Sequence, residues 1–213
     1  MSEGDTRLSI VSTSSAPRPS LSGLAPFAFG DAAFGLIRER AGQARLDITV
    51  TDAARPLVVA QLATIAEAPV LVVTANGREA DDLTTELTEF LAPGPNGTPV
   101  VAQFPSWETL PHERLSPSAD TVGARLAVLS RLADSTVAPL RVVVATVRSL
   151  VQPMAPGLGA LRAVTLTEGV EADFDHLIEQ LVEMAYERVD MVERRGEFAV
   201  RGGILDVFPP TEE

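Results

Sequence analysis

Residues 186–210 read YERVDMVERRGEFAVRGGILDVFPP and contain two short runs in which apolar and polar residues alternate. The runs span residues 197–201 and 204–208, and Gly202-Gly203 separates them. Two-residue hairpin turns need positive φ angles, which glycine adopts without strain, so this pattern predicts a β-hairpin. Because side chains alternate between the faces of a strand, we expect one face to pack on a core and the other to hold charges in water.

Charged side chains of both signs are concentrated in the same stretch. The basic members are Arg188, Arg194, Arg195 and Arg201, and the acidic members are Glu187, Asp190, Glu193, Glu197 and Asp206. A sheet face with mixed charges around a few apolar side chains is typical of a polar protein–protein contact. The spacing alone favours the simpler interpretation of an amphipathic hairpin with solvated charges, because exposed charges are the default on such a face.

Upstream of this stretch, the sequence alternates strand-like and helix-like segments. Strands are predicted at residues 47–51, 69–74, 100–104 and 141–146, and helices at residues 27–41, 56–66, 78–91 and 118–132. The uninterrupted apolar run at 69–74 predicts a strand that is buried on both faces. The alternation as a whole implies an α/β domain with a doubly wound parallel sheet.

The predicted domain organisation follows changes in composition. Residues 1–26 are rich in Ser, Pro and Gly and predict a disordered tail. Residues 27–152 form the α/β domain, and a Pro- and Gly-rich segment follows it. Residues 153–213 then predict a small α+β domain, with a strand at 161–166, a helix at 174–185 and the hairpin.

The overall composition limits the classes of partner. The chain has 213 residues, a formal net charge of −12 and no cysteine. An acidic chain repels the phosphates of DNA, and a single Trp and a single Tyr offer little surface for base stacking. The sequence contains no membrane-spanning run and no signal peptide, and the lack of cysteine fits the cytoplasm. We therefore expect a protein-binding platform.

Several motifs carry a specific resemblance. They are RVD at 188–190, RGEFAVRGG at 195–203 and DVFP at 206–209, together with FPSWETLP at 104–111, Ser116-Pro117 and Asp120. The first three resemble the module shared by bacterial transcription-repair coupling factor and the excision nuclease protein UvrB. The patch at 104–111 is similar to the coupling factor and differs from UvrB, whose tyrosine-rich hairpin is replaced here by the short loop 107–116. The resemblance runs, with gaps, from about Asp47 to the C-terminus.

The resemblance implies a fold, a function and a set of contact residues. The first domain is expected to be a degenerate RecA-like (P-loop NTPase-like) domain, and the second a small UvrA-binding domain that is incomplete at its C-terminus. The full-length protein would use ATP and Mg to translocate on DNA, displace a stalled RNA polymerase and recruit UvrA; this chain would need no cofactor. The C-terminal domain of the full-length protein would cover the surface that binds UvrA. The residues expected to contact UvrA are Arg188, Glu193, Arg194, Arg201 and Leu205.

One departure from the family pattern weakens the expected contact, because Ala199 stands where UvrB has an arginine two residues before the position of Arg201.

The loop that would bind nucleotide lacks the residues for that chemistry. A P-loop uses glycines, a lysine and a Ser or Thr to hold phosphates. Here the corresponding positions are Asp52, Ala53, Ala54 and Arg55. No glycine lets the backbone approach a phosphate, and Asp52 would repel it, so we expect no catalysis by this chain.

Two alternatives stay open. One is an ATP- or DNA-binding domain of a UvrB-like or helicase-like enzyme, and the other is a generic α/β domain with an unrelated ligand. Neither His112 nor His176 has the spacing of a metal ligand, so no metal site is predicted.

Overall fold

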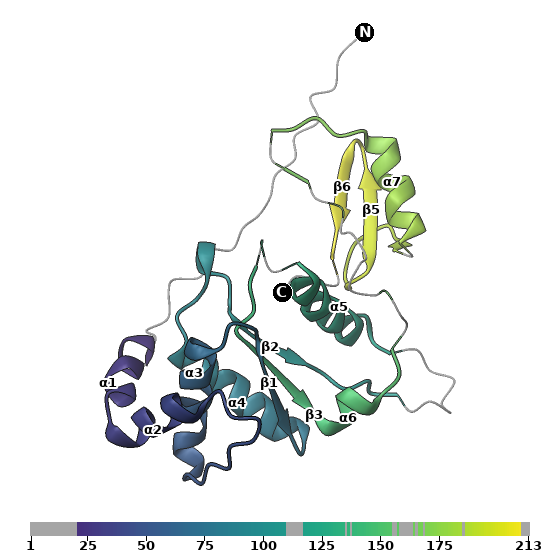
Figure 1. The fold of residues 1–213 in the computed structure, drawn as a ribbon. Coiled ribbons are helices and arrows are strands. Elements are labelled where there is room, and N and C mark those ends of the chain that lie inside the picture. Colours follow the sequence, from purple (N-terminus) through teal and green to yellow (C-terminus); the bar gives the residue numbers. More distant parts are fainter. Residues whose placement is uncertain are drawn as a thin grey trace.

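The computed structural model describes residues 21–109, 117–134, 136, 138–154, 157, 164, 166–167, 169–184 and 186–209. These residues form two three-stranded sheets that are widely separated in sequence. Figure 1 shows the parallel sheet with helices on its two faces and the smaller sheet beyond helix α5. The α/β class predicted from the sequence is confirmed.

The N-terminal helical segment is split in two. The 3₁₀-helix η1 (Leu21–Gly23) precedes α1 (Ala25–Phe29), and α2 (Ala32–Arg40) follows. The single helix expected at 27–41 is therefore wrong, because the Asp31 carboxylate accepts a hydrogen bond from the Ala33 N–H at 2.8 Å and begins a new helix there. The rings of Phe29 and Phe34 still face each other, 5.9 Å between centroids.

The strand expected at residues 47–51 is also absent. These residues are extended, but in the described chain only β1, β2 and β3 form the parallel sheet. An extended segment counts as a strand only when its backbone pairs with a neighbour. The segment leads into the 3₁₀-helix η2 (Asp52–Ala54) and then α3 (Arg55–Ile65), which matches the predicted helix at 56–66.

The first sheet contains β1 (Val70–Thr74), β2 (Val101–Phe104) and β3 (Val142–Thr146), all parallel, in the order β1-β3-β2. Every residue of the central strand β3 is buried, whereas β1 lies at the edge, with Leu71 53% and Val73 48% exposed. The expectation that residues 69–74 are buried on both faces is therefore wrong. Their apolar run gives no information about whether a strand lies at the centre or at the edge.

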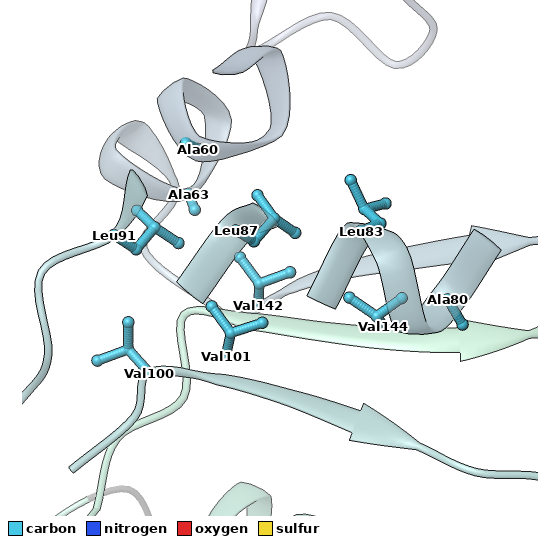
Figure 2. Packing of buried hydrophobic residues seen from close by; sticks show 10 residues of the cluster. All are labelled: Ala60, Ala63, Ala80, Leu83, Leu87, Leu91, Val100, Val101, Val142 and Val144. Carbon is cyan, nitrogen blue, oxygen red and sulfur yellow. The ribbon is translucent and has the colours of Figure 1, made fainter. Parts of the chain in front are cut away.

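Helices on the two faces build two separate parts of the core. The helix α4 (Gly77–Phe90) packs with α3 over one face, and α5 (Ala119–Ala133) covers β2 and β3 on the other. Figure 2 shows Leu83 and Leu87 of α4 above Val101, Val142 and Val144. A short 3₁₀-helix η3 (Pro95–Gly97) lies before β2, and α6 (Val147–Val151), which was not predicted, follows β3 directly.

The smaller sheet follows α7 (Phe174–Glu183) and contains β4 (Glu187–Arg188), β5 (Glu197–Arg201) and β6 (Ile204–Val207). The predicted hairpin is confirmed, since β5 and β6 are antiparallel and Gly202-Gly203 joins them. The strand β4, which pairs parallel to β5, was missed. The strand expected at 161–166 lies outside the described residues, apart from positions 164 and 166.

Candidate protein-docking surface

The hairpin turn has the geometry that its two glycines predict. Gly202 has φ 54° and Gly203 has φ 87°, so both central residues lie in the left-handed region that a type I′ turn requires. The register pairs Arg201 with Ile204 and Val200 with Leu205. The turn therefore fixes which side chains share a face.

The five predicted contact residues, Arg188, Glu193, Arg194, Arg201 and Leu205, are called the docking residues below. Arg188 pairs with Phe198 in the parallel ladder, and Leu205 pairs with Val200, so the pleat directs these docking residues to the face of Phe198. Arg201 pairs with Ile204 on the opposite face and lies beside the turn. The ladder thus distributes the docking residues over both faces.

The middle of β5 is covered from both sides. Phe198 and its neighbour Ala199 are both fully buried, although they point in opposite directions. The expectation of one buried and one solvated face therefore fails at Ala199. Water-exposed charge is concentrated instead at the ends of the strands, where Arg188 and Arg201 are exposed.

Arg201 is already paired within the hairpin. Its Nη2 lies 2.5 Å from Oδ2 of Asp206, and the two side chains are 60% and 38% exposed. An ion pair this exposed contributes little to stability. It does hold the guanidinium in one orientation, and most of that group stays accessible to a partner.

Glu193 and Arg194 lie in the loop at residues 189–196, which connects β4 to β5. Their backbone N–H groups both donate to Oε2 of Glu197, each at 2.8 Å. These two hydrogen bonds, from Glu193 first and Arg194 next, hold the pKa of the Glu197 carboxyl group below its ordinary value, and the nearby positive charge of Arg194 adds to the effect. The carboxylate fixes the loop backbone while both docking side chains stay exposed.

The next residue of this loop, Arg195, reaches helix α5, which covers the parallel sheet. Arg195 Nη1 lies 2.6 Å from Oδ1 of Asp120, in the first turn of α5, and its guanidinium carbon lies 5.4 Å from the centroid of the Phe208 ring. An open hollow of about 420 Å³ lies here, lined by Ser118, Ala119, Asp120, Glu193, Arg194, Arg195 and Phe208. No local pattern in the sequence indicates this contact, because its partners are 75 positions apart.

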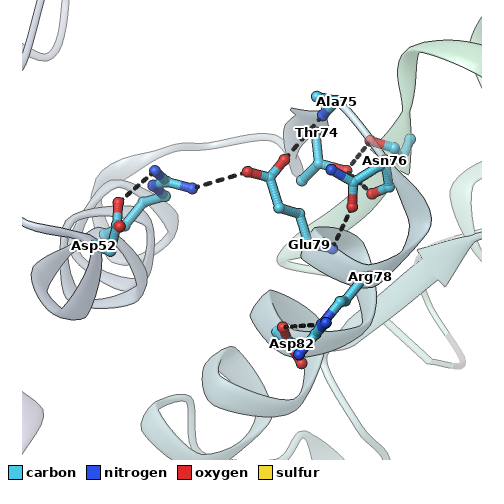
Figure 3. Close-up of polar contacts among 9 residues, drawn as sticks. Asp52, Thr74, Ala75, Asn76, Arg78, Glu79 and Asp82 are labelled. Atoms are coloured by element: carbon cyan, nitrogen blue, oxygen red, sulfur yellow. Dashed lines mark hydrogen bonds and ion pairs between the residues drawn. The ribbon is translucent and has the colours of Figure 1, made fainter.

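The predicted degenerate nucleotide loop is occupied by its own ion pairs. Asp52 Oδ1 lies 2.8 Å from Arg55 Nη2, and Arg55 Nη1 lies 3.7 Å from Glu79 Oε1. Figure 3 shows that Glu79, in the first turn of α4, also reaches back to Ala75, whose N–H donates to Glu79 Oε2 at 3.1 Å. Ala53 and Ala54 complete η2. Two carboxylates beside Arg55, and no glycine from Asp52 to Arg55, do not suit a phosphate group.

The described residues contain no group of three or more His, Cys, Asp or Glu side chains that could hold a metal ion. His176 is exposed, with Nδ1 3.9 Å from Oε2 of Glu179, and His112 lies outside the described residues. Within the described chain, none of the helices has the length and apolar character needed to cross a bilayer.

Comparison with known proteins agrees with the resemblance. The family described as "UvrB interaction domain" matches residues 164–213. The transcription-repair-coupling factor of Mycobacterium tuberculosis is 51% identical over 91% of this chain, and those of Myxococcus xanthus and Escherichia coli are 38% and 32% identical over 80% and 82%. The chain spans only 14–16% of the length of these relatives. Residues 164–213 are therefore similar to the UvrB interaction domain, and the chain corresponds, over most of its residues, to a segment of the transcription-repair-coupling factors.

Proposed function

We propose that this chain is the part of a transcription-repair-coupling factor that recruits UvrA. The proposal is carried by one observation, the match of residues 164–213 to the UvrB interaction domain within a chain that is 51% identical to a coupling factor. The small sheet has the properties of a polar docking site, since exposed guanidinium groups surround a few half-buried apolar side chains. Recognition of a stalled RNA polymerase, translocation on DNA and the use of ATP and Mg belong to other parts of the full-length cytoplasmic protein.

The docking residues supply the contact in this proposal. Arg188 and Arg201 are its polar anchors, because a planar guanidinium pairs with a partner carboxylate through two parallel hydrogen bonds. Leu205 is half-buried on the face of Arg188 and offers an apolar contact beside it. Glu193 and Arg194 extend the contact along the loop that Glu197 holds. The C-terminal domain of the same protein covers this surface until recruitment begins, so opening shifts the population towards the docking state.

The alternative of a nucleotide- or DNA-binding enzyme domain has less support. Arg55 is the only cation at the degenerate nucleotide loop, and its guanidinium is shared between Asp52 and Glu79. A phosphate approaching it would meet those two carboxylates, with no glycine to open the backbone. We therefore propose that this segment keeps the scaffold of a motor domain and has lost its nucleotide site.

Titration calorimetry of this chain with purified UvrA tests the proposal. Arg201→Ala should weaken binding by about 2 kcal/mol if Arg201 is a hot spot, and Arg188→Ala should weaken it in the same direction. Arg78→Ala is the matched control, because Arg78 is an arginine with a 92% exposed side chain far from the small sheet. Circular dichroism should show an unchanged fold in all three variants.

The same purified chain and its variants decide between UvrA recruitment and the nucleotide- or DNA-binding alternative. Failure of the wild-type chain to bind UvrA, together with measurable binding of ATP, would overturn the proposal and favour the enzyme domain. Wild-type affinity in Arg201→Ala would remove Arg201 from the contact and leave the other docking residues to be tested one by one.

A further inference from the structure

We infer that Asp120 positions the docking residues of the small sheet, acting through Arg195. Asp120 lies on α5, in the part of the molecule built on β1, β2 and β3, which is called the first unit below; β4, β5 and β6 with α7 form the second. The inference rests on the proposed function for the identity of the partner. It assigns a role to two residues outside the predicted contact set. Asp120 would not touch UvrA; it would set the orientation in which the docking residues are presented.

The contact between the two units is well defined. Arg195 Nη1 lies 2.6 Å from Asp120 Oδ1, and the Arg195 side chain is 26% exposed, against 67% for Asp120. The guanidinium also lies over the ring of Phe208, which directly follows β6. One arginine therefore connects the first turn of α5 to the base of the hairpin, the end of the small sheet that lies near α5 in Figure 1.

The loop that carries Arg195 is fixed to the small sheet. Gly196 N–H donates to the Phe208 carbonyl at 2.8 Å, and Glu187 N–H donates to the Gly196 carbonyl at 2.8 Å. Glu197 holds the N–H groups of Glu193 and Arg194. A restraint on Arg195 is thus transmitted to its docking neighbours, because this backbone cannot turn without breaking those hydrogen bonds.

A hydrogen-bond network also fixes the chain just after α6, before it continues towards the small sheet. After α6, the Gln152 side chain accepts from Trp107 N–H at 2.7 Å and donates to the Trp107 carbonyl at 3.2 Å. The indole N–H of Trp107 then donates to the Pro153 carbonyl at 3.3 Å. This network holds Gln152 and Pro153 to the Trp107 backbone and ring of the first unit. The contact of Asp120 with Arg195 links the small sheet to α5 at a position far in sequence from this point.

The competing interpretation is an exposed ion pair without consequence, since such pairs often contribute nothing measurable. The two interpretations differ in what reversal of the charges does. If the pair sets orientation, reversing Asp120 alone releases the sheet, and reversing both residues restores it. A pair without consequence gives the same orientation in all variants.

The lack of cysteine in the sequence makes the test direct. Spin labels at Glu86→Cys on α4 and Val182→Cys on α7, both exposed positions, report the distance between the units by pulsed electron resonance. We expect a single narrow distribution in the unsubstituted background, a broad one in Asp120→Arg and Asp120→Asn, and a narrow one again in Asp120→Arg/Arg195→Asp. Asp47→Arg, a charge reversal at an exposed residue of the first unit, should leave the distribution narrow.

UvrA affinity, measured without the labels, completes the test. Asp120→Arg should weaken binding by about fivefold, and Asp120→Arg/Arg195→Asp should recover most of the loss. Unchanged distributions in the single variants would overturn the inference, and so would a broadened distribution with unchanged affinity. If the wild-type chain does not bind UvrA, the proposed function fails, and the distance distributions still decide whether the contact orients the sheet.

Discussion

Arg125 is the most deeply buried charged residue of the described chain, at 1% exposure. Its guanidinium lies between two aromatic rings, 4.0 Å from the centroid of Phe104 and 4.1 Å from that of Trp107, and Nη1 donates to the Pro105 carbonyl at 2.6 Å. Its Nε and Nη2 have no hydrogen-bond partner, and burial lowers the pKa of the group. Stacking therefore holds this side chain in place, and the side chain in turn holds the Phe104–Trp107 segment against α5.

Replacement of Arg125 should separate packing from charge. Arg125→Ala removes both ring contacts and leaves a cavity, so we expect the free energy of unfolding to fall by about 3 kcal/mol. Arg125→Met keeps the volume and removes the two unpartnered donors, so its cost should be clearly smaller. Trp107 is the only tryptophan, and its fluorescence should shift to longer wavelength in Arg125→Ala at low denaturant. Equal losses in the two variants would show that charge, not packing, matters at this site.

Glu108 gives the first α/β unit a specific dependence on pH. Burial raises the pKa of its carboxyl group, but hydrogen bonds donated by Ser118 and Thr121 outweigh this, and the pKa lies below its ordinary value of 4.5. A carboxyl group with a lowered folded-state pKa stabilises the fold above its unfolded-state pKa, and this stabilisation is lost as pH falls through the folded-state value.

Comparison of Glu108→Gln with the wild type checks the direction in which this stabilisation changes with pH. The variant should be less stable at pH 7, and the difference should shrink as the pH falls below the ordinary value of 4.5 and then through the lower folded-state pKa of the wild-type carboxyl group. Urea unfolding at several pH values measures it. A difference that grows on acidification would contradict the assignment.

At the scale of the elements, the sequence predicted what local chemistry determines. Glycines at positive φ specify the β5–β6 turn, and Asn76 and Ser118 begin α4 and α5 by accepting N–H groups with their side chains. The predictions that were wrong concern the pairing of strands and the continuity of the first helix. Residues 47–51 alternate like a strand but have no neighbour in the parallel sheet, and β4 is too short to carry a pattern. Pairing depends on residues distant in sequence, which no local window contains.

The hairpin turn predicts unequal losses of stability for substitutions at two adjacent glycines. Gly203 has φ 87°, so Gly203→Ala should cost about 1 kcal/mol through backbone strain. Gly202 has φ 54°, where asparagine is tolerated, so Gly202→Asn should cost much less. Thermal unfolding followed by circular dichroism would rank them. An equal loss in both variants would mean that the turn is not of type I′.

The order of the strands predicts different costs for two valines. Val144, on central β3, is fully buried, whereas Val73, on edge strand β1, is 48% exposed. Val144→Ala should lower the free energy of unfolding by about 2 kcal/mol, and Val73→Ala by less than about 1 kcal/mol. Denaturant titration of both variants measures the difference. Similar costs would contradict the position of β1 at the edge.

At the scale of the whole molecule, sequence reasoning proposed the docking residues but did not indicate the contact that we infer orients them. Arg188, Arg201 and Leu205 lie within a short segment, where motif correspondence can propose contact residues directly. The partner of Arg195 lies on α5, and only the fold brings Asp120 to it. The assignment of the docking residues to two faces likewise depends on the parallel pairing of β4 with β5, which the sequence did not indicate.

The distribution of charge over the molecule predicts whether it binds nucleic acid. The chain has 29 acidic against 17 basic side chains, and Arg55, Arg195 and Arg201 are each paired with a carboxylate in the fold. Affinity for duplex DNA comes mainly from free cations that neutralise phosphates and release counterions. We therefore expect no mobility shift of a duplex by this chain at micromolar concentration, at low or at physiological salt. Retardation of DNA that weakens steeply as salt increases would show that a basic surface outweighs the net charge, and it would restore the DNA-binding alternative.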